Sequence, residues 1–220
     1  MTSKIAPAPW HLTGKGYVLA VYLPNQFLDH HSFIPAHLQA SRRGRIAYII
    51  FADYQQSDVG AYYELLYIGG SLKFGEQRHH SISKIYVSSQ DSIDNGQKNW
   101  GIPKEMAQFK VNYGTDNQDS ICLSSPTGDM IAQLHFSHHL LRFPVNTKLA
   151  PTRLITLAQD WHNTRFFFAP QANGHLKPAL LKDCYINSQY FPDIAQGRVV
   201  ACFKVADFSM IFPVPKTQAV

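Results

Sequence analysis

The feature of this sequence that most limits its fold is an apolar alternation with a period of two, repeated along most of the chain. In residues 107–113, Ala107, Phe109, Val111 and Tyr113 fall on one face while polar residues fall on the other. Similar β-branched and aromatic runs recur with turn residues between them. They predict strands at residues 15–23, 45–53, 62–68, 82–88, 107–113, 119–124, 130–136, 153–157, 164–168, 180–186 and 199–205. Many short strands separated by turns are typical of a β-sandwich or β-barrel.

Two predicted helices interrupt this pattern. Residues 25–31 form a short amphipathic segment. The second helix begins after Ser88 or Ser89, because serine caps a helix N-terminus well. It ends before Gly101, because glycine is favoured just past the last helical residue. The chain then turns and enters the strand of residues 107–113.

The composition is that of an ordinary globular protein. The 220 residues are 45% hydrophobic, which is enough for a core without disulfides or metals, and no repeat or linker-like run divides residues 1–220 into separate domains. Cys122, Cys184 and Cys202 lie in apolar runs and read as buried thiols in a reducing compartment. No apolar stretch resembles a signal peptide or a membrane span, so we expect a cytoplasmic protein with no membrane partner.

The net charge of +5 does not by itself indicate a nucleic-acid partner. It comes from 20 basic and 15 acidic residues, and the one tight basic cluster is Arg42, Arg43 and Arg45. No aromatic platform accompanies this cluster, so a solvated turn is favoured over a nucleic-acid surface.

Lys104 has an unusual local setting. It follows a stiff turn, because Pro103 fixes its own φ and restricts Ile102. Apolar neighbours such as Trp100 and Met106 could keep its amine away from water, and burial lowers the pKa of a lysine. A neutral amine attacks ketones and forms imines. The alternative is a surface lysine whose stem packs on the core, and spacing alone favours that alternative.

Other candidate residues carry less information by themselves. Glu64 lies in an aromatic and leucine-rich run, either on the polar face of an exposed strand or turned into a cavity. Lys15 stands between two glycines. The 11 histidines include adjacent pairs, but neighbours in a strand point to opposite sides, so we predict no metal site. No nucleotide-binding or serine-hydrolase motif is present, and we predict no cofactor.

Several motifs, in this order and spacing, resemble the acetoacetate decarboxylase family. They are Pro9 to Tyr17, Ile34-Pro35-Ala36-His37-Leu38, Tyr62-Tyr63-Glu64, Ile85-Tyr86-Val87 before a helix, and Trp100-Gly101-Ile102-Pro103-Lys104. The match is clearest over residues 9–113, and a helix followed by Gly-x-Pro-Lys is its most specific part.

The resemblance implies a mostly β fold: an antiparallel barrel or cone with a central cavity and a few short helices, usually in a homo-oligomer. It also implies catalytic roles for two residues, with Lys104 as the Schiff-base lysine and Glu64 as the active-site glutamate. The expected substrate-binding residues are Lys15, Tyr62, Trp100 and Glu105.

Two positions depart from the family pattern. Glu105 stands where the decarboxylase has a second lysine, and a carboxylate close to Lys104 raises the pKa of its amine. Lys15 stands in the place of an arginine, so the planar fork that grips a carboxylate is missing. Both departures weaken acetoacetate decarboxylation as the specific reaction more than they weaken imine chemistry.

Two functions follow as hypotheses. The first is a lyase that binds a small keto acid and forms a Schiff base through Lys104, for decarboxylation or for aldolase and dehydratase chemistry. The second is a non-catalytic barrel that binds small molecules and retains the lysine, because a fold does not determine a function. Glu105 favours this second hypothesis.

Overall fold

The computed structural model describes residues 4–220, most of which lie in two β-sheets. The strands of the larger sheet are β1 (Trp10–Tyr22), β2 (Ile46–Gln56), β3 (Tyr62–Ile68), β6 (Lys84–Val87), β7 (Lys104–Met106), β8 (Gln108–Tyr113), β9 (Gln118–Ser124), β10 (Met130–His138), β11 (Phe143–Asn146), β14 (Gln171–Ile186) and β15 (Arg198–Phe212). The smaller sheet contains β4 (Ser71–Phe74), β5 (Gln77–His80), β12 (Leu157–Trp161), β13 (Thr164–Phe168) and β16 (Lys216–Ala219). The helices are α1 (Asn25–His30), α2 (Ala36–Gln39), α3 (Gln90–Trp100) and α4 (Thr152–Ile155), with 3-10 turns at Thr147–Leu149 and Ile194–Gln196.

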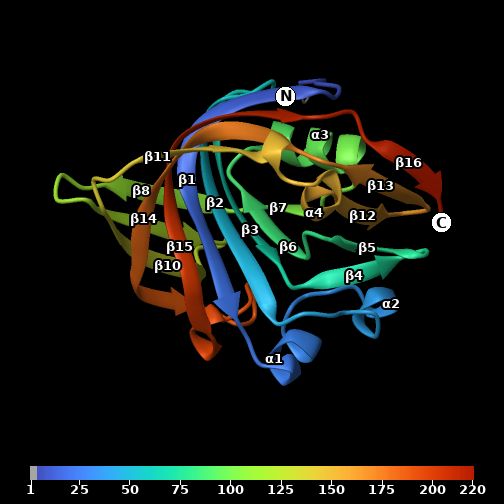
Figure 1. Ribbon diagram of the computed structural model, residues 1–220, viewed down its shortest axis with the longest axis horizontal. Coiled ribbons are helices and arrows are strands. Elements are labelled where there is room, and N and C mark those ends of the chain that lie inside the picture. The colour runs from blue at the N-terminus through green and yellow to red at the C-terminus, as the bar shows by residue number, and fades with distance from the viewer. Residues whose placement is uncertain (1–3) are drawn as a thin grey trace.

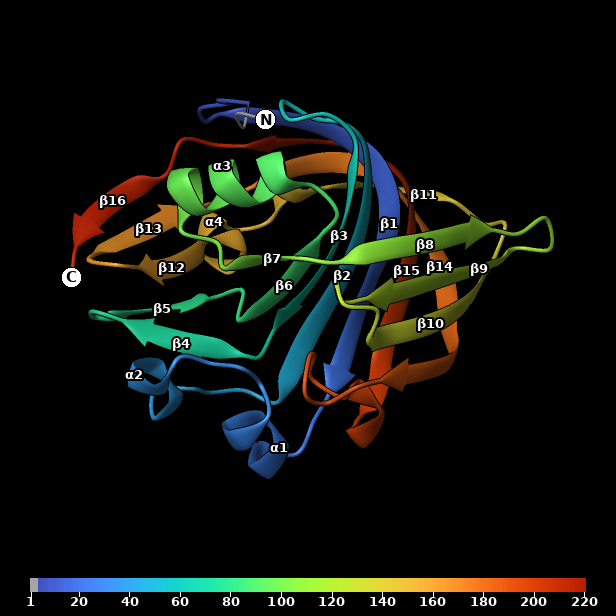
Figure 2. The same cartoon turned by 180° about the vertical axis from the view of Figure 1, so that it is seen from behind.

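The larger sheet bends until its two ends approach each other (Figures 1 and 2). Its strand order is β7-β6-β3-β2-β1-β15-β14-β10-β9-β8, with β11 beside β14, so β7 and β8 lie at opposite ends of the order. These two strands are consecutive in the chain and are joined only by Ala107, whose amide donates to the carbonyl of Val87 at 2.9 Å. The sheet is therefore a nearly closed barrel. The predicted fold class, a mostly β, largely antiparallel barrel with a few short helices, is confirmed.

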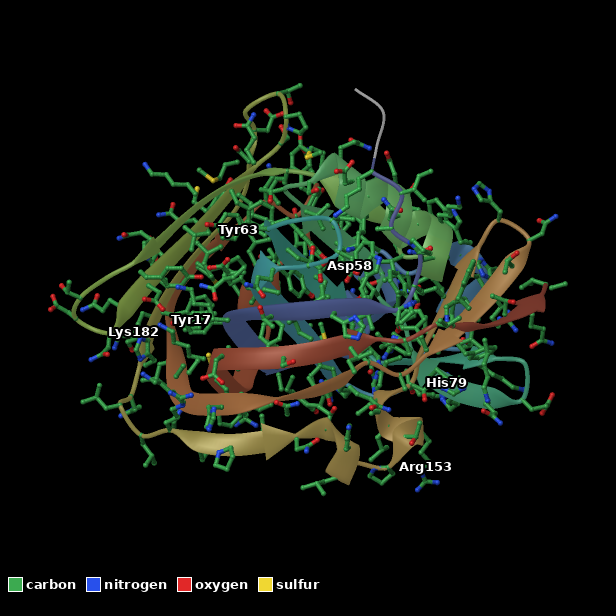
Figure 3. The ribbon with its side chains drawn as sticks, turned by 90° about the horizontal axis from the view of Figure 1, so that it is seen from above. Tyr17, Asp58, Tyr63, His79, Arg153 and Lys182 are labelled. Carbon is green, nitrogen blue, oxygen red and sulfur yellow. The ribbon has the colours of Figure 1, made fainter. Side chains whose placement is uncertain are left out.

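The central strands β1, β2 and β3 are buried on both faces, because their alternating side chains enter two different cores. On β3, Leu65 and Tyr67 belong to the core shared with β9 and β10, whereas Leu66 and Ile68 belong to the core beside α3 and β13. Figure 3 shows Tyr17 and Tyr63 on the side of β8–β10, where their rings stack on Phe136 and Phe109, and His79 on the opposite side. Side chains one residue apart on these strands therefore enter different cores.

The predicted helices at residues 25–31 and after Ser89 are confirmed, and so are most predicted strands. The strand predicted at residues 153–157 is wrong. Pro151 precedes a helical turn, α4, in which the amide of Thr156 donates to the carbonyl of Thr152, and β12 starts only at Leu157. The short helix α2 and the short strands β4, β5, β7, β11 and β16 were not predicted.

Across residues 4–220 we find no helix with the length and the hydrophobicity needed to cross a bilayer. The single domain and the homo-oligomer stay predictions.

Neighbouring leucines on β3 test the two-core description. Leu65 is fully buried in a packed core, whereas Leu66 lines a cavity described below and so has fewer atoms in contact. We expect Leu65→Ala to lower the free energy of unfolding by about 4 kcal/mol, and Leu66→Ala to cost at least about 1 kcal/mol less. Urea denaturation of both variants measures the difference. Equal losses would contradict the description.

Candidate active site

The local structure around α3 positions Lys104. The hydroxyl of Ser89 accepts from the amide of Ser92 and caps the helix, and Gly101 ends it at φ 65°, a conformation that glycine adopts most easily. Lys104 then begins β7, paired with Ile85 of β6. Its side chain runs back along α3, where a Cβ on Gly96 would lie only 2.8 Å from its Cδ and Cε. A glycine at residue 96 therefore leaves room for the lysine stem.

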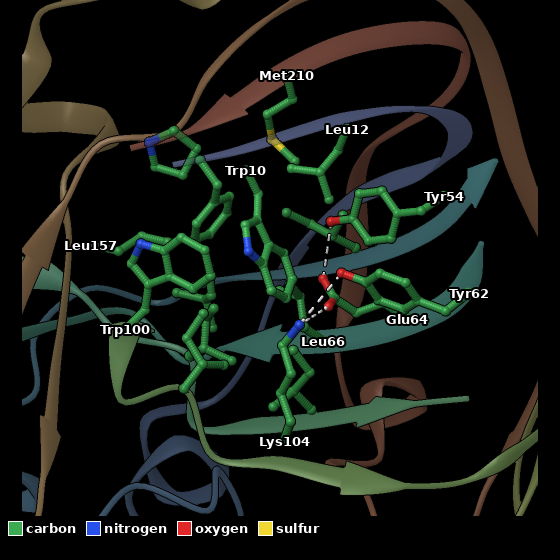
Figure 4. A pocket seen from close by; sticks show the side chains of 17 residues that line it. Trp10, Leu12, Tyr54, Tyr62, Glu64, Leu66, Trp100, Lys104, Leu157 and Met210 are labelled. Carbon is green, nitrogen blue, oxygen red and sulfur yellow. Dashed lines mark hydrogen bonds and ion pairs between the residues drawn. The ribbon is translucent and has the colours of Figure 1, made fainter. Parts of the chain in front are cut away.

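The amine of Lys104 enters a small apolar cavity (Figure 4). The cavity has a volume of about 170 Å³ and lies in the second core, between β1–β3, α3 and the end of β15. Lys104 is 5% exposed, so its amine is removed from bulk water. Most of the lining is hydrocarbon, with Trp10 and Trp100 as its largest side chains.

Three polar side chains contact the amine, and a fourth, Tyr54, contacts the carboxylate that pairs with it. The Nζ of Lys104 donates to the Oγ of Ser92 at 2.9 Å and to the hydroxyl of Tyr62 at 3.5 Å. It also forms an ion pair of 3.0 Å with the Oε2 of Glu64, which is itself buried. The hydroxyl of Tyr54 donates to the other carboxylate oxygen, Oε1, at 3.2 Å. The amine and the carboxylate therefore contact each other directly, and each also has hydrogen bonds to neighbouring hydroxyl groups.

Burial and the neighbouring groups have opposite effects on the pKa of Lys104. Burial lowers the pKa of Lys104, but the Glu64 carboxylate and the Tyr62 hydroxyl raise it, and the net result is a pKa above the ordinary value. Burial also raises the pKa of Tyr62 to about 12, so this phenol stays protonated near neutral pH. The resting proton therefore lies on Lys104, and Glu64 is positioned to receive it.

Four of the predicted site residues meet in this cavity: Lys104, Glu64, Tyr62 and Trp100. Tyr62 and Glu64 come together because they are two residues apart on β3 and so share a face. Trp100 is the last residue of α3, and its indole N–H donates to the carbonyl of Pro213 at 2.7 Å.

Glu105 does not reach the cavity. It follows Lys104 directly in β7, so its side chain points to the opposite face. There it is 51% exposed and forms an ion pair of 2.6 Å with Lys84. The carboxylate that raises the pKa of Lys104 therefore belongs to Glu64 and not, as the departure from the family pattern suggested, to Glu105.

Lys15 also lies away from the cavity, and its expected role in substrate binding stays a prediction. Trp10 and Leu12 line the cavity from β1, and Lys15 is an odd number of residues away, on the other face. Its Nζ lies 4.0 Å from Asp53 and 3.5 Å from the centre of the Tyr113 ring.

Sequence analysis missed several residues of this site, namely Trp10, Tyr54, Ser92 and Gly96. Tyr54 could have been found, because the antiparallel register of β2 and β3 places it directly opposite Tyr62. Ser92 and Trp10 had no comparable signal, because their contacts with the lysine depend on tertiary packing. Within residues 4–220, no three His, Cys, Asp or Glu side chains lie close enough to bind a metal ion.

Comparison with known proteins gives matches in structure only. No family model and no curated protein matches the sequence. The acetoacetate decarboxylase from Legionella pneumophila superposes with a TM-score of 0.69 at 12% identity, over 100% of this chain and 92% of that one. An acetoacetate decarboxylase-like enzyme from Sphingomonas wittichii gives a TM-score of 0.70 at 9% identity, over 98% and 94%. The chain has the acetoacetate decarboxylase fold.

The enduracididine biosynthesis enzyme MppR, solved with pyruvate, has the same acetoacetate decarboxylase fold. It gives a TM-score of 0.65 at 13% identity, over 98% of this chain and 92% of that one. At such low identities the likeness is one of fold, and the reaction must be inferred from the residues of this chain.

The pKa of Lys104 offers a direct test of the ion pair. In Glu64→Gln the main raising influence is lost while burial remains, so the pKa of Lys104 should fall by more than about one pH unit. Acetylation of Lys104 by acetic anhydride, followed by mass spectrometry across a pH series, measures this change. Glu105→Gln is the matched control and should leave the profile in place. A profile that moves in the control and not in Glu64→Gln would contradict the assignment.

Proposed function

We propose that this protein is a carbon–carbon lyase that forms a Schiff base between Lys104 and a small carbonyl compound. The observation that carries the proposal is the buried amine of Lys104, which opens into an apolar cavity 3.0 Å from the carboxylate of Glu64. The acetoacetate decarboxylase fold supports it. The keto acid expected from the sequence is one candidate substrate.

In the proposed formation of the imine, Glu64 carries two protons in turn from the nitrogen of Lys104 to the oxygen of the carbonyl compound. Lys104 transfers its proton to Glu64, and the neutral amine attacks the carbonyl carbon. The π electron pair moves to the oxygen, which takes the proton back from Glu64. The nitrogen then gives a second proton to Glu64, and this proton leaves with the hydroxyl as water. One carbonyl compound and one ammonium thus become one protonated imine and one water, with no change in charge.

The protonated imine would withdraw electrons from a neighbouring C–C or C–H bond. Decarboxylation and aldol chemistry both use this electron sink. Among the proteins with this fold, MppR was solved with the condensation product of pyruvate and imidazole 4-carboxaldehyde, which is the kind of compound that aldol chemistry forms. Both reactions therefore stay within the proposed function.

One observation favours the second candidate function, a non-catalytic barrel that binds small molecules and forms no imine. The pKa of Lys104 is raised, so the resting amine is protonated and not nucleophilic. In a binding protein the Lys104–Glu64 pair would be a permanent structural ion pair. Chemical trapping distinguishes the two functions.

Borohydride reduction should fix the imine as a stable secondary amine. We expect a mass increase at Lys104 after incubation with members of a panel of ketones, aldehydes and keto acids, and none in Lys104→Arg. Lys15→Ala is the matched lysine control and should be labelled like the unmodified protein. If no member of the panel adds mass at Lys104, the binding barrel is the correct function.

The variant Gly96→Ala tests whether the position of the Lys104 amine affects imine formation without a loss of stability. Alanine favours a helix over glycine by up to about 1 kcal/mol, and the three heavy atoms nearest to its Cβ all belong to the flexible end of Lys104. We expect an unchanged or higher melting temperature together with roughly tenfold or greater loss of trapping, because the amine is displaced. The exposed Lys98→Ala on the same helix should trap normally. Normal trapping by Gly96→Ala would contradict the role of this glycine.

A further inference from the structure

The charges of the cavity are balanced before any substrate enters. Within residues 4–220, Lys104 and Glu64 are the only cavity-lining side chains that carry a formal charge at neutral pH. The two charges neutralise each other at 3.0 Å. The remaining lining consists of two tyrosines, two tryptophans, and aliphatic, proline, methionine and phenylalanine side chains.

The polar hydrogens of the large aromatic residues are already used. The indole N–H of Trp10 donates to the carbonyl of Ala6 at 2.9 Å, and that of Trp100 donates to Pro213. The hydroxyl of Tyr54 donates to Glu64. Of the aromatic N–H and O–H groups in the described lining, only the Tyr62 hydroxyl is left to donate to a ligand, and it already accepts from Lys104.

A carboxylate in this cavity would therefore lack a cation of its own. Imine formation consumes the only lysine, and the protonated imine remains paired with Glu64. A substrate carboxylate would add a second negative charge in an apolar space, with its hydrogen bonds to water lost. The cation that the sequence assigned to a substrate carboxylate, Lys15, lies on the opposite face of β1 beside Asp53.

The volume of the cavity limits the size of the ligand. An apolar cavity of about 150 Å³ holds one benzene molecule. The cavity around Lys104, at about 170 Å³, thus suits a compact ligand of similar size. Half-buried side chains such as Leu157, Pro170 and Met210 belong to the lining and offer the ligand hydrocarbon contacts.

From these observations, and resting on the proposed Schiff-base function, we propose that the substrate is an uncharged ketone or aldehyde with a compact hydrocarbon body, and not a keto acid. The apolar lining favours a ligand with hydrocarbon groups, and the neutral ion pair leaves no cation to bind a ligand carboxylate. The reaction is then of the aldol type, because an uncharged substrate has no carboxylate to lose.

An uncharged β-hydroxy ketone illustrates the proposed step. Glu64 takes the proton of the hydroxyl group, the C–C bond breaks, and its electron pair moves into the iminium to give an enamine and an aldehyde. The enamine carbon takes the proton from Glu64, and water then hydrolyses the iminium. This releases the ketone and restores the ammonium of Lys104. The reverse direction joins the ketone and the aldehyde.

A matched pair of compounds tests this selection. Levulinate and isoamyl methyl ketone have the same carbon skeleton around the ketone, but a carboxylate in the first replaces an isopropyl group in the second. Borohydride trapping at Lys104 is measured with each compound, and each rate is divided by its rate with a free lysine derivative. We expect the normalised rate for the ketone to exceed that for levulinate at least tenfold.

The other outcomes have separate meanings. Equal or faster trapping of levulinate overturns the substrate class while leaving the Schiff-base function in place. Trapping of neither compound, nor of any other carbonyl compound in the wider panel, overturns the Schiff-base function itself and the substrate class with it.

A charge placed in the lining tests the cause of the selection. In Met210→Arg a cation joins the cavity, and we expect the ratio of levulinate to ketone trapping to rise at least tenfold. Met210→Gln is the matched neutral control and should leave the ratio near that of the unmodified protein. Circular dichroism verifies that both variants fold, and the wild-type comparison stands without them. An unchanged ratio in a folded Met210→Arg would show that charge does not set the selection.

Discussion

The ion pair between Lys104 and Glu64 is the interaction on which the rest of this site depends. Both side chains are buried in an apolar cavity, where an unpaired charge is costly, so each stabilises the other. The pair determines where the resting proton lies, and it leaves the cavity without net charge. Under the proposed function the pair also supplies both an amine and a base at one carbonyl carbon. Transfer of the proton from Lys104 to Glu64, and not a lowered pKa, then activates the amine.

The alternation of β1–β3 explains why this pair is isolated from the other charged groups of the barrel. Even-numbered residues of β3 enter the cavity, while odd-numbered residues enter the core beside β8–β10. The core beside β8–β10 has its own polar network, in which Asp119 accepts from Tyr17 and Lys204, each at 2.6 Å. Two adjacent strand faces thus hold two separate sets of charges, and a shift of one residue would exchange them.

A mostly β fold and the turn into Lys104 could be predicted from local patterns: the period of two, the serine cap and the glycine after α3. The choice of a barrel over a sandwich came from the family resemblance. The predicted meeting of Lys104 with Glu64, Tyr62 and Trp100 came from the family resemblance. Tyr54 was missed although the pairing of β2 with β3 places it opposite Tyr62, and Ser92 was missed because its contact with Lys104 depends on how the side chain of Lys104 packs back along α3. The resemblance assigned Lys15 by its distance from Tyr17 and took no account of which face of the strand it lies on, and Lys15 lies outside the cavity lining. Its odd spacing from Trp10 and Leu12 already placed it opposite the cavity.

The central claim is that the buried amine of Lys104 bonds covalently to a carbonyl carbon. Nuclear magnetic resonance of protein carrying ¹⁵N-labelled lysine, mixed with isobutyl methyl ketone labelled with ¹³C at its carbonyl, tests this without any reductant. We expect a carbon signal in the imine range with a one-bond coupling to a single lysine nitrogen, absent in Lys104→Arg. A spectrum that contains only the unaltered ketone and uncoupled lysine nitrogens, with this ketone and with labelled pyruvate alike, would contradict it.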